Sequence, residues 1–157
     1  MEQKKQKKEI VTIANYQRLA MRTCLPSCKN TDYAYLGSLS EYHELQSKIC
    51  GYKAKKIRGD SEEKLAEVKK SIIDEIGDCF WFIALQCTLA KKSFEHIYKM
   101  KIKDLNDIEL GIKCHTDDLK KYCKEWKVSP LTCMKRNIAK LLSRKERGVI
   151  QGNGDER

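Results

Sequence analysis

Apolar side chains recur along most of this chain at spacings of three and four residues, the repeat of an amphipathic α-helix. The strongest pattern spans residues 62–91, and weaker ones cover residues 9–23, about 33–50 and about 130–147. The apolar face of the strongest segment consists of Leu65, Val68, Ile72, Ile76, Cys79, Phe80 and Ile83. Because no segment shows the pattern of a sheet, the sequence predicts an all-α helical bundle.

Helix-breaking and capping residues set the expected boundaries of these helices. Pro26 ends the first helix, and Gly51 is a suitable C-terminal stop for the second. Residues 53–60, rich in lysine and arginine, are then expected to form an exposed loop. Asp60 and Glu63 resemble a capping box that opens the helix at 62–91.

The C-terminal half begins less regularly. Residues 93–127 are expected to form short helical pieces broken near Gly111, with one piece ending at Trp126. Ser129-Pro130 combines an N-cap residue with proline at the first helical position, so the last helix begins there. Residues 148–157 form a polar, glycine-rich tail.

Composition narrows the class of protein. The 157 residues suffice for one domain, so 1–157 is taken as a single unit. No apolar run approaches the roughly 18 residues of a membrane span, and no long apolar stretch follows the basic N-terminus. We therefore expect neither membrane insertion nor secretion. The net charge of +10 favours an acidic partner, either nucleic acid or a phosphorylated small molecule.

Eight cysteines do not form a recognisable disulfide or zinc framework. Several lie among apolar helical positions, where a free thiol packs as a small hydrophobe. Four residues that could assemble a metal site match no zinc spacing well: Cys114, His115, Cys123 and Cys133. We expect reduced thiols and a cytoplasmic protein.

Two acidic pairs carry the candidate chemistry. Glu41 and Glu44 lie three residues apart on one expected helix, and Glu75 and Asp78 lie three apart on the next. Residues at this spacing share a helix face, so two facing antiparallel helices can gather four carboxylates in one small volume. Oxygen ligands of this kind suit a hard cation.

The spacing alone is weak, because a chain with 22 acidic residues produces such pairs by chance. What distinguishes these two pairs is their position beside apolar segments, where a carboxylate is costly unless it is paired or metal-bound. The alternative is that all four point to solvent and pair with lysines such as Lys48, Lys69 or Lys70. The pattern by itself favours neither reading.

Four segments resemble the MazG-like family of nucleoside triphosphate pyrophosphohydrolases. The two acidic segments read Gly37-Ser-Leu-Ser-Glu-Tyr-His-Glu-Leu and Asp74-Glu-Ile-Gly-Asp-Cys-Phe-Trp-Phe. The opening and closing helices contribute Tyr16-Gln-Arg-Leu-Ala and Asn137-Ile-Ala-Lys-Leu-Leu-Ser-Arg-Lys-Glu-Arg-Gly, and Gly152-Asn-Gly-Asp-Glu-Arg is similar to the tail of phage-type members. Residues 99–133 have no counterpart and read as an inserted short-helix segment, expected to pack on the bundle as a subunit contact or as a lid.

The resemblance implies an all-α fold and a Mg²⁺-dependent reaction, with Mn²⁺ as a possible substitute. The reaction cleaves a nucleoside triphosphate between the α- and β-phosphates. Glu41, Glu44, Glu75 and Asp78 would hold the metal, and one of them, such as Glu44, could instead accept a proton from water. The expected contacts to substrate are Lys48, Asn137, Lys140 and Arg144.

The resemblance also implies a homodimer or a dimer of dimers. A second reason for self-association is that the apolar, tryptophan-containing helix at 62–91 needs more cover than one short chain easily supplies. Two alternative functions stay open: a basic helical nucleic-acid-binding protein, for which the acidic pairs would be incidental, and a MazG-like regulator without activity. Nucleic acid is not required by the favoured interpretation.

Overall fold

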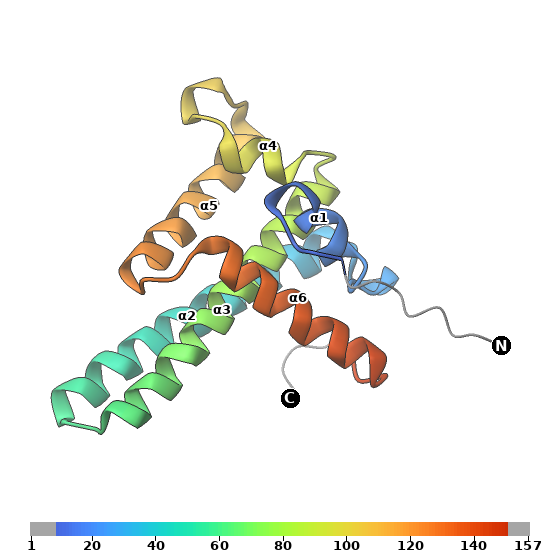
Figure 1. The fold of residues 1–157 in the computed structure, drawn as a ribbon. Helices are drawn as coiled ribbons and strands as arrows, with labels where there is room; N and C mark the ends of the chain where they lie inside the picture. Colours follow the sequence, from blue (N-terminus) through green and yellow to red (C-terminus); the bar gives the residue numbers. More distant parts are fainter. Residues whose placement is uncertain (1–8, 151–157) are drawn as a thin grey trace.

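The computed structural model describes residues 9–150, and within them every regular element is helical (Figure 1). The elements are α1 (Ile13–Met21), η1 (Pro26–Cys28), α2 (Thr31–Arg58), α3 (Glu62–Leu89), α4 (Phe94–Lys99), η2 (Ile102–Asp104), α5 (Asp107–Glu125) and α6 (Pro130–Glu146), where η denotes a 3₁₀ turn. The predicted all-α class is confirmed. The basic stretch at 1–8 and the tail motif at 152–157 lie outside the described residues.

Helix α3 is the axis of the fold, and each of the other five α-helices packs against it. Every residue of α3 from 75 to 85 is buried. Contrary to the expectation that this apolar, tryptophan-containing stretch needs a second subunit for cover, helices of the same chain cover residues 75–85. Helices α2 and α3 form a long antiparallel hairpin whose closed end extends beyond the other helices (Figure 1). Within residues 9–150, no helix combines the length and apolar character that a bilayer crossing requires.

The second helix is longer than the sequence predicts. Instead of stopping at Gly51, α2 continues to Arg58 and ends at Gly59, which has a left-handed φ of 82° and donates its N–H to the carbonyl of Lys56. The basic residues expected in a loop therefore lie on a helix. Packing explains the difference, because the ring of Tyr52, next to Gly51, lies 4.8 Å from that of Trp126.

Alanine substitutions distinguish these two glycines. Gly51→Ala is expected to raise the free energy of unfolding by about 0.5–1 kcal/mol, because alanine is the better helix former and the added methyl group meets open space. Gly59→Ala is expected to lower it by about 1–2 kcal/mol, because alanine resists the left-handed conformation. Urea denaturation of both variants measures the effects, and destabilisation by Gly51→Ala would contradict the observed helix end.

Two further boundaries differ in detail. Helix α3 begins as predicted, but Ser61 caps it by accepting from the Lys64 N–H, while Asp60 pairs with Arg58. Helix α5 runs through Gly111 without the predicted break, since Asn106 and Glu109 supply a capping box at its start. The predicted start of α6 at Ser129-Pro130 is confirmed.

The segment at 99–133 packs closely on the bundle, as expected. Most of it is α5, which lies against α3 and buries Ile112, Leu119 and Cys123 in the common core. Its far end reaches α2, where the Trp126 ring meets Tyr52 edge-on. The segment therefore forms a side of the bundle along the α2–α3 hairpin.

Candidate metal centre and adjoining cavity

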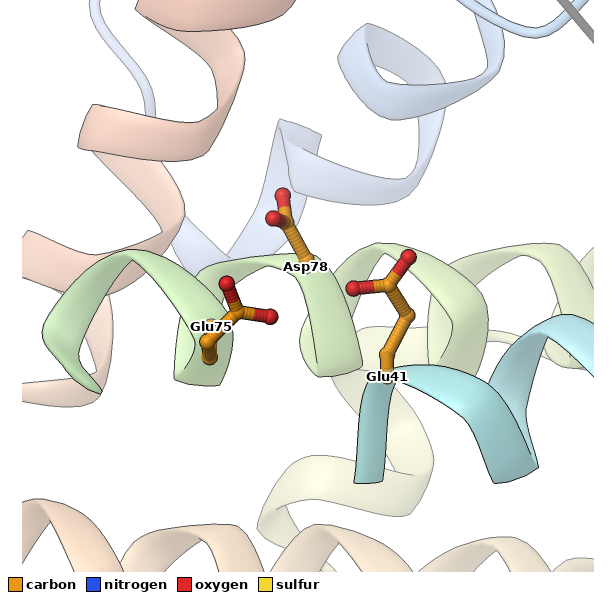
Figure 2. A group of neighbouring side chains, drawn as sticks. All are labelled: Glu41, Glu75 and Asp78. Atoms are coloured by element: carbon orange, nitrogen blue, oxygen red, sulfur yellow. The ribbon is translucent and has the colours of Figure 1, made fainter. Parts of the chain in front are cut away.

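Three of the four predicted carboxylates meet between α2 and α3. Glu41 projects from α2, while Glu75 and Asp78 project one turn apart from α3, and the three side chains point toward one another (Figure 2). One oxygen from each lies within 4.8 Å of the other two. All three residues are more than nine-tenths buried, which is unusual for carboxylates unless they are paired or bind a metal.

Glu44, the fourth predicted ligand, does not join this group. It is half-buried on α2, one turn beyond Glu41, and lines a cavity beside the three carboxylates. The structure thus separates the predicted four-carboxylate set into a buried group of three and one carboxylate on the cavity wall.

Lysines from two helices pair with the buried group. Lys48 of α2 forms an ion pair with Glu75. Lys140 of α6 donates from Nζ to both carboxylate oxygens of Asp78, at 2.7 and 2.6 Å. Asn137, one turn before Lys140, donates from Nδ2 to Asp78 Oδ1 at 2.6 Å. Three of the four residues predicted to contact substrate therefore contact the carboxylates directly.

A glycine on α3 allows α6 to come this close. A Cβ added at Gly77 would lie 2.7 Å from the Cys133 carbonyl oxygen and 3.0 Å from the Asn137 Cβ. Any side chain at this position would therefore push α6 away from α3. Gly77 is adjacent to Asp78, so the same contact holds Asn137 and Lys140 over that carboxylate.

Two buried oxygens at the centre accept no hydrogen bond from any residue in the described range. They are Glu75 Oε2 and Asn137 Oδ1, and their residues are 4% and 2% exposed. A buried oxygen without a donor is destabilising, so these two atoms point to a missing positive partner. Three carboxylates and an amide oxygen are hard donors that fit Mg²⁺ or Mn²⁺. Within residues 9–150, no other group of three or more histidine, cysteine, aspartate or glutamate side chains meets in this way.

A cavity of about 750 Å³ opens beside the centre. Its polar and charged lining residues include Glu41, Glu44, Asp78, Asn137, Arg144 and Arg147. Its apolar lining residues include Leu25, Tyr33, Leu36, Trp81, Phe82 and Leu141. The cavity therefore offers both charged groups and aromatic or aliphatic ones, and no described residue of the 99–133 segment lines it.

The aromatic wall is held in place by specific contacts. The Trp81 indole N–H donates to the Ala20 carbonyl at 3.2 Å and to Thr23 Oγ1 at 3.0 Å, which fixes the ring as a structural part of the wall. The Phe82 ring occupies the space beside Gly37, where an added Cβ would lie 2.2 Å from it. The glycine of the first acidic segment thus makes room for an aromatic residue of the second.

Burial and negative charge keep the neighbouring groups neutral. Burial raises the pKa of the Cys79 thiol well above its usual range, and the carboxylates of Glu41 and Asp78 raise it further. Burial likewise raises the pKa of the Tyr16 hydroxyl, with a further contribution from Asp78. Neither group ionises near neutral pH, so the negative charge of the centre comes from carboxylates alone.

The cysteine-rich set considered for zinc does not assemble in the structure. All eight cysteines are free, and Cys114 is exposed on α5. The two buried thiols of Cys123 and Cys133 lie 3.9 Å apart. They belong to no metal-binding group within the described part of the chain.

Several residues at the site were not predicted. Cys24, Leu25 and Cys28 line the cavity from the turn after α1, and Arg136 joins α6 to α3 through a 2.8 Å ion pair with Asp74. Arg144, predicted as a contact to substrate, lines the cavity. No sequence motif marks the turn, because its place at the cavity depends on how α1 packs on α3.

Comparison of the chain with protein-family models, with curated proteins and with solved structures finds no match.

Proposed function

We propose that this chain is a Mg²⁺-dependent nucleoside triphosphate pyrophosphohydrolase of the MazG-like type. The observation that carries this proposal is the convergence of Glu41, Glu75 and Asp78, which come from the two acidic segments, beside a cavity of nucleotide size. The motif resemblance supplies the reaction, which is cleavage between the α- and β-phosphates to give a nucleoside monophosphate and pyrophosphate.

The residues divide the chemistry among them. Glu41, Glu75 and Asp78 hold the cation, which when bound neutralises phosphate oxygens and lowers the pKa of the attacking water. Glu44 lies on the cavity wall outside the ligand group, where it accepts the proton of that water. The water oxygen bonds to the α-phosphorus, the bond to the bridging oxygen breaks, and pyrophosphate leaves.

The triphosphate and the nucleoside are proposed to bind in the cavity beside the metal centre. Arg144 lies one helical turn beyond Lys140, so both cations can reach the triphosphate and stabilise its charge during transfer. Aromatic lining residues such as Tyr33 and Phe82 receive the nucleoside. The presence of both charged and aromatic lining residues suits a ligand that carries phosphates and an aromatic base.

Assembly and location are part of the same proposal. The MazG resemblance implies a homodimer or a dimer of dimers, and the free thiols suit a cytoplasmic location. Three exposed apolar side chains on α2 offer a surface for such a contact: Tyr35, Leu36 and Leu39, which are 62%, 63% and 50% exposed. Leu36 also lines the cavity, so a contact there would adjoin the substrate.

A nucleotide panel tests the function. We expect pyrophosphate release from at least one ribo- or deoxyribonucleoside triphosphate, abolished by a chelator and restored by Mg²⁺ or Mn²⁺, with monophosphate as the co-product. Nucleotide binding without turnover would indicate the inactive regulator instead. No turnover together with salt-dependent binding of DNA or RNA would favour the nucleic-acid-binding alternative.

A further inference from the structure

The metal centre contains positive charges that belong to the protein. Glu41, Glu75 and Asp78 bring three carboxylates into a space where their oxygens lie within 4.8 Å of one another. Lys48 and Lys140 each place an ammonium group on one of them. Two ammonium groups carry the same total charge as one divalent cation, so a cation that replaced them would leave the charge of the centre unchanged.

The two lysines occupy ligand atoms that a metal needs. Lys140 contacts both oxygens of Asp78, and Lys48 contacts Oε1 of Glu75. Both carboxylates are almost fully buried, with side chains 8% and 5% exposed. A cation held by Glu75 and Asp78 must therefore compete with these ammonium groups for the same oxygens.

The lysine side chains are able to leave. Their exposed fractions are 36% for Lys48 and 25% for Lys140, far above those of their partners, because the stems run from helix surfaces toward the centre. Long, flexible lysine side chains can move their charge to a new partner without any change in the backbone. The two come from different helices, α2 and α6, so each can leave independently.

We propose that Lys48 and Lys140 are exchangeable internal counter-ions of the metal centre. Before a divalent cation binds, they neutralise the carboxylates. Once both the cation and the triphosphate are bound, the two ammonium groups contact the phosphates of the substrate instead. This role depends on the proposed function, because the cation and the triphosphate are its two ligands. It explains how a cluster of buried carboxylates is tolerated without metal, and why lysines suited to phosphate point at carboxylates instead.

Binding of the two ligands is then coupled. A cation alone must displace both ammonium groups from their buried carboxylates, whereas a bound triphosphate also offers the displaced groups new anionic partners. Metal alone therefore binds weakly, and the triphosphate strengthens it by accepting the displaced charges. Replacing either lysine with a neutral side chain removes the competitor.

The test measures affinity for Mn²⁺ alone, without nucleotide. Lys48→Met and Lys140→Met are each expected to bind Mn²⁺ about tenfold more tightly than the wild type, within the usual range of coupling between sites. The matched control is Lys70→Met, an exposed lysine of α3 five residues before Glu75, which removes the same charge without touching a ligand. Its change is expected to stay below about twofold, because solvent and salt screen its charge. If Lys48→Met and Lys140→Met bind Mn²⁺ no more tightly than the wild type and Lys70→Met do, the proposal is overturned.

A wild-type measurement covers the case in which a methionine variant fails to fold. The rate of amine acylation, read residue by residue from mass spectra, is expected to rise at Lys48 and Lys140 when Mg²⁺ is added and to stay constant at Lys70. Unchanged acylation at both lysines with saturating Mg²⁺ refutes the exchange. Pyrophosphate release is assayed separately, so exchange without hydrolysis would reject only the proposed reaction, and hydrolysis without exchange would reject only the counter-ion role.

Discussion

Glu75→Gln is expected to reduce pyrophosphate release by at least about a hundredfold while the protein stays folded, because a metal ligand loses its charge. Glutamine has nearly the same shape as glutamate, so the core around position 75 keeps its packing. Glu75 is 4% exposed and one of its oxygens has no hydrogen-bond partner among the described residues, so the lost charge was costly to bury. Turnover measures the first effect, and thermal unfolding without metal checks that the fold persists.

The matched control is Glu67→Gln, an exposed glutamate on the same helix two turns earlier. It removes the same charge far from the ligand group and is expected to leave turnover within about twofold, since exposed charges are screened. If Glu75→Gln kept full turnover, the assignment of this carboxylate as a ligand would be wrong. If it instead strengthened binding to DNA or RNA, the nucleic-acid alternative would gain support, because the protein would be more positive.

Gly77→Ala is expected to lower the free energy of unfolding by about 1–3 kcal/mol, the usual cost of overpacking a core. The added methyl group would meet the carbonyl oxygen of Cys133 at 2.7 Å, and a backbone atom cannot move aside as a flexible side chain can. Helix α6 must therefore shift as a unit. That shift withdraws Asn137 and Lys140 from Asp78, so turnover falls together with stability.

Gly111→Ala provides the contrast within the same protein. This glycine also lies inside a helix, but a Cβ added there meets nothing within 4 Å. The substitution is expected to stabilise the chain by about 0.5–1 kcal/mol, the difference in helix propensity. Denaturant unfolding of the two variants compares them directly. Equal stability of the two variants would mean that α6 does not approach α3 as closely as the structure shows.

Local sequence patterns predicted the helices and helix starts that depend only on residues close together in the chain. The apolar repeat of α3 and the Ser129-Pro130 start of α6 require only neighbours along the chain, and both were predicted correctly. The end of α2 was not. A glycine at position 51 weakens a helix by roughly 1 kcal/mol, but contact between Tyr52 and Trp126 outweighs that cost. No window of local sequence contains both of those rings.

The candidate site likewise contains features that the sequence predicted and contacts that it did not. The spacing of the two acidic pairs predicted that Glu41, Glu75 and Asp78 meet, whereas Glu44, predicted with them, lies on the cavity wall. Which cation faces which carboxylate was not predictable, because it depends on the register between packed helices. Lys48 was predicted as a contact to substrate, and in the structure it pairs across the hairpin with Glu75. The register of α6 is set by Gly77, whose importance appears only when both helices are in place.

The placement of charges also makes the fold more cooperative. All three buried carboxylates lie on the α2–α3 hairpin, which contributes Lys48 as the partner of Glu75. The second ammonium group arrives from α6, through a contact that joins residues 62 positions apart. The hairpin alone is therefore electrostatically incomplete, and its stability depends on docking of the C-terminal helix. Helices that could otherwise unfold one by one are thereby linked through a shared charge balance, so the acidic cluster favours folding of the domain as a single unit.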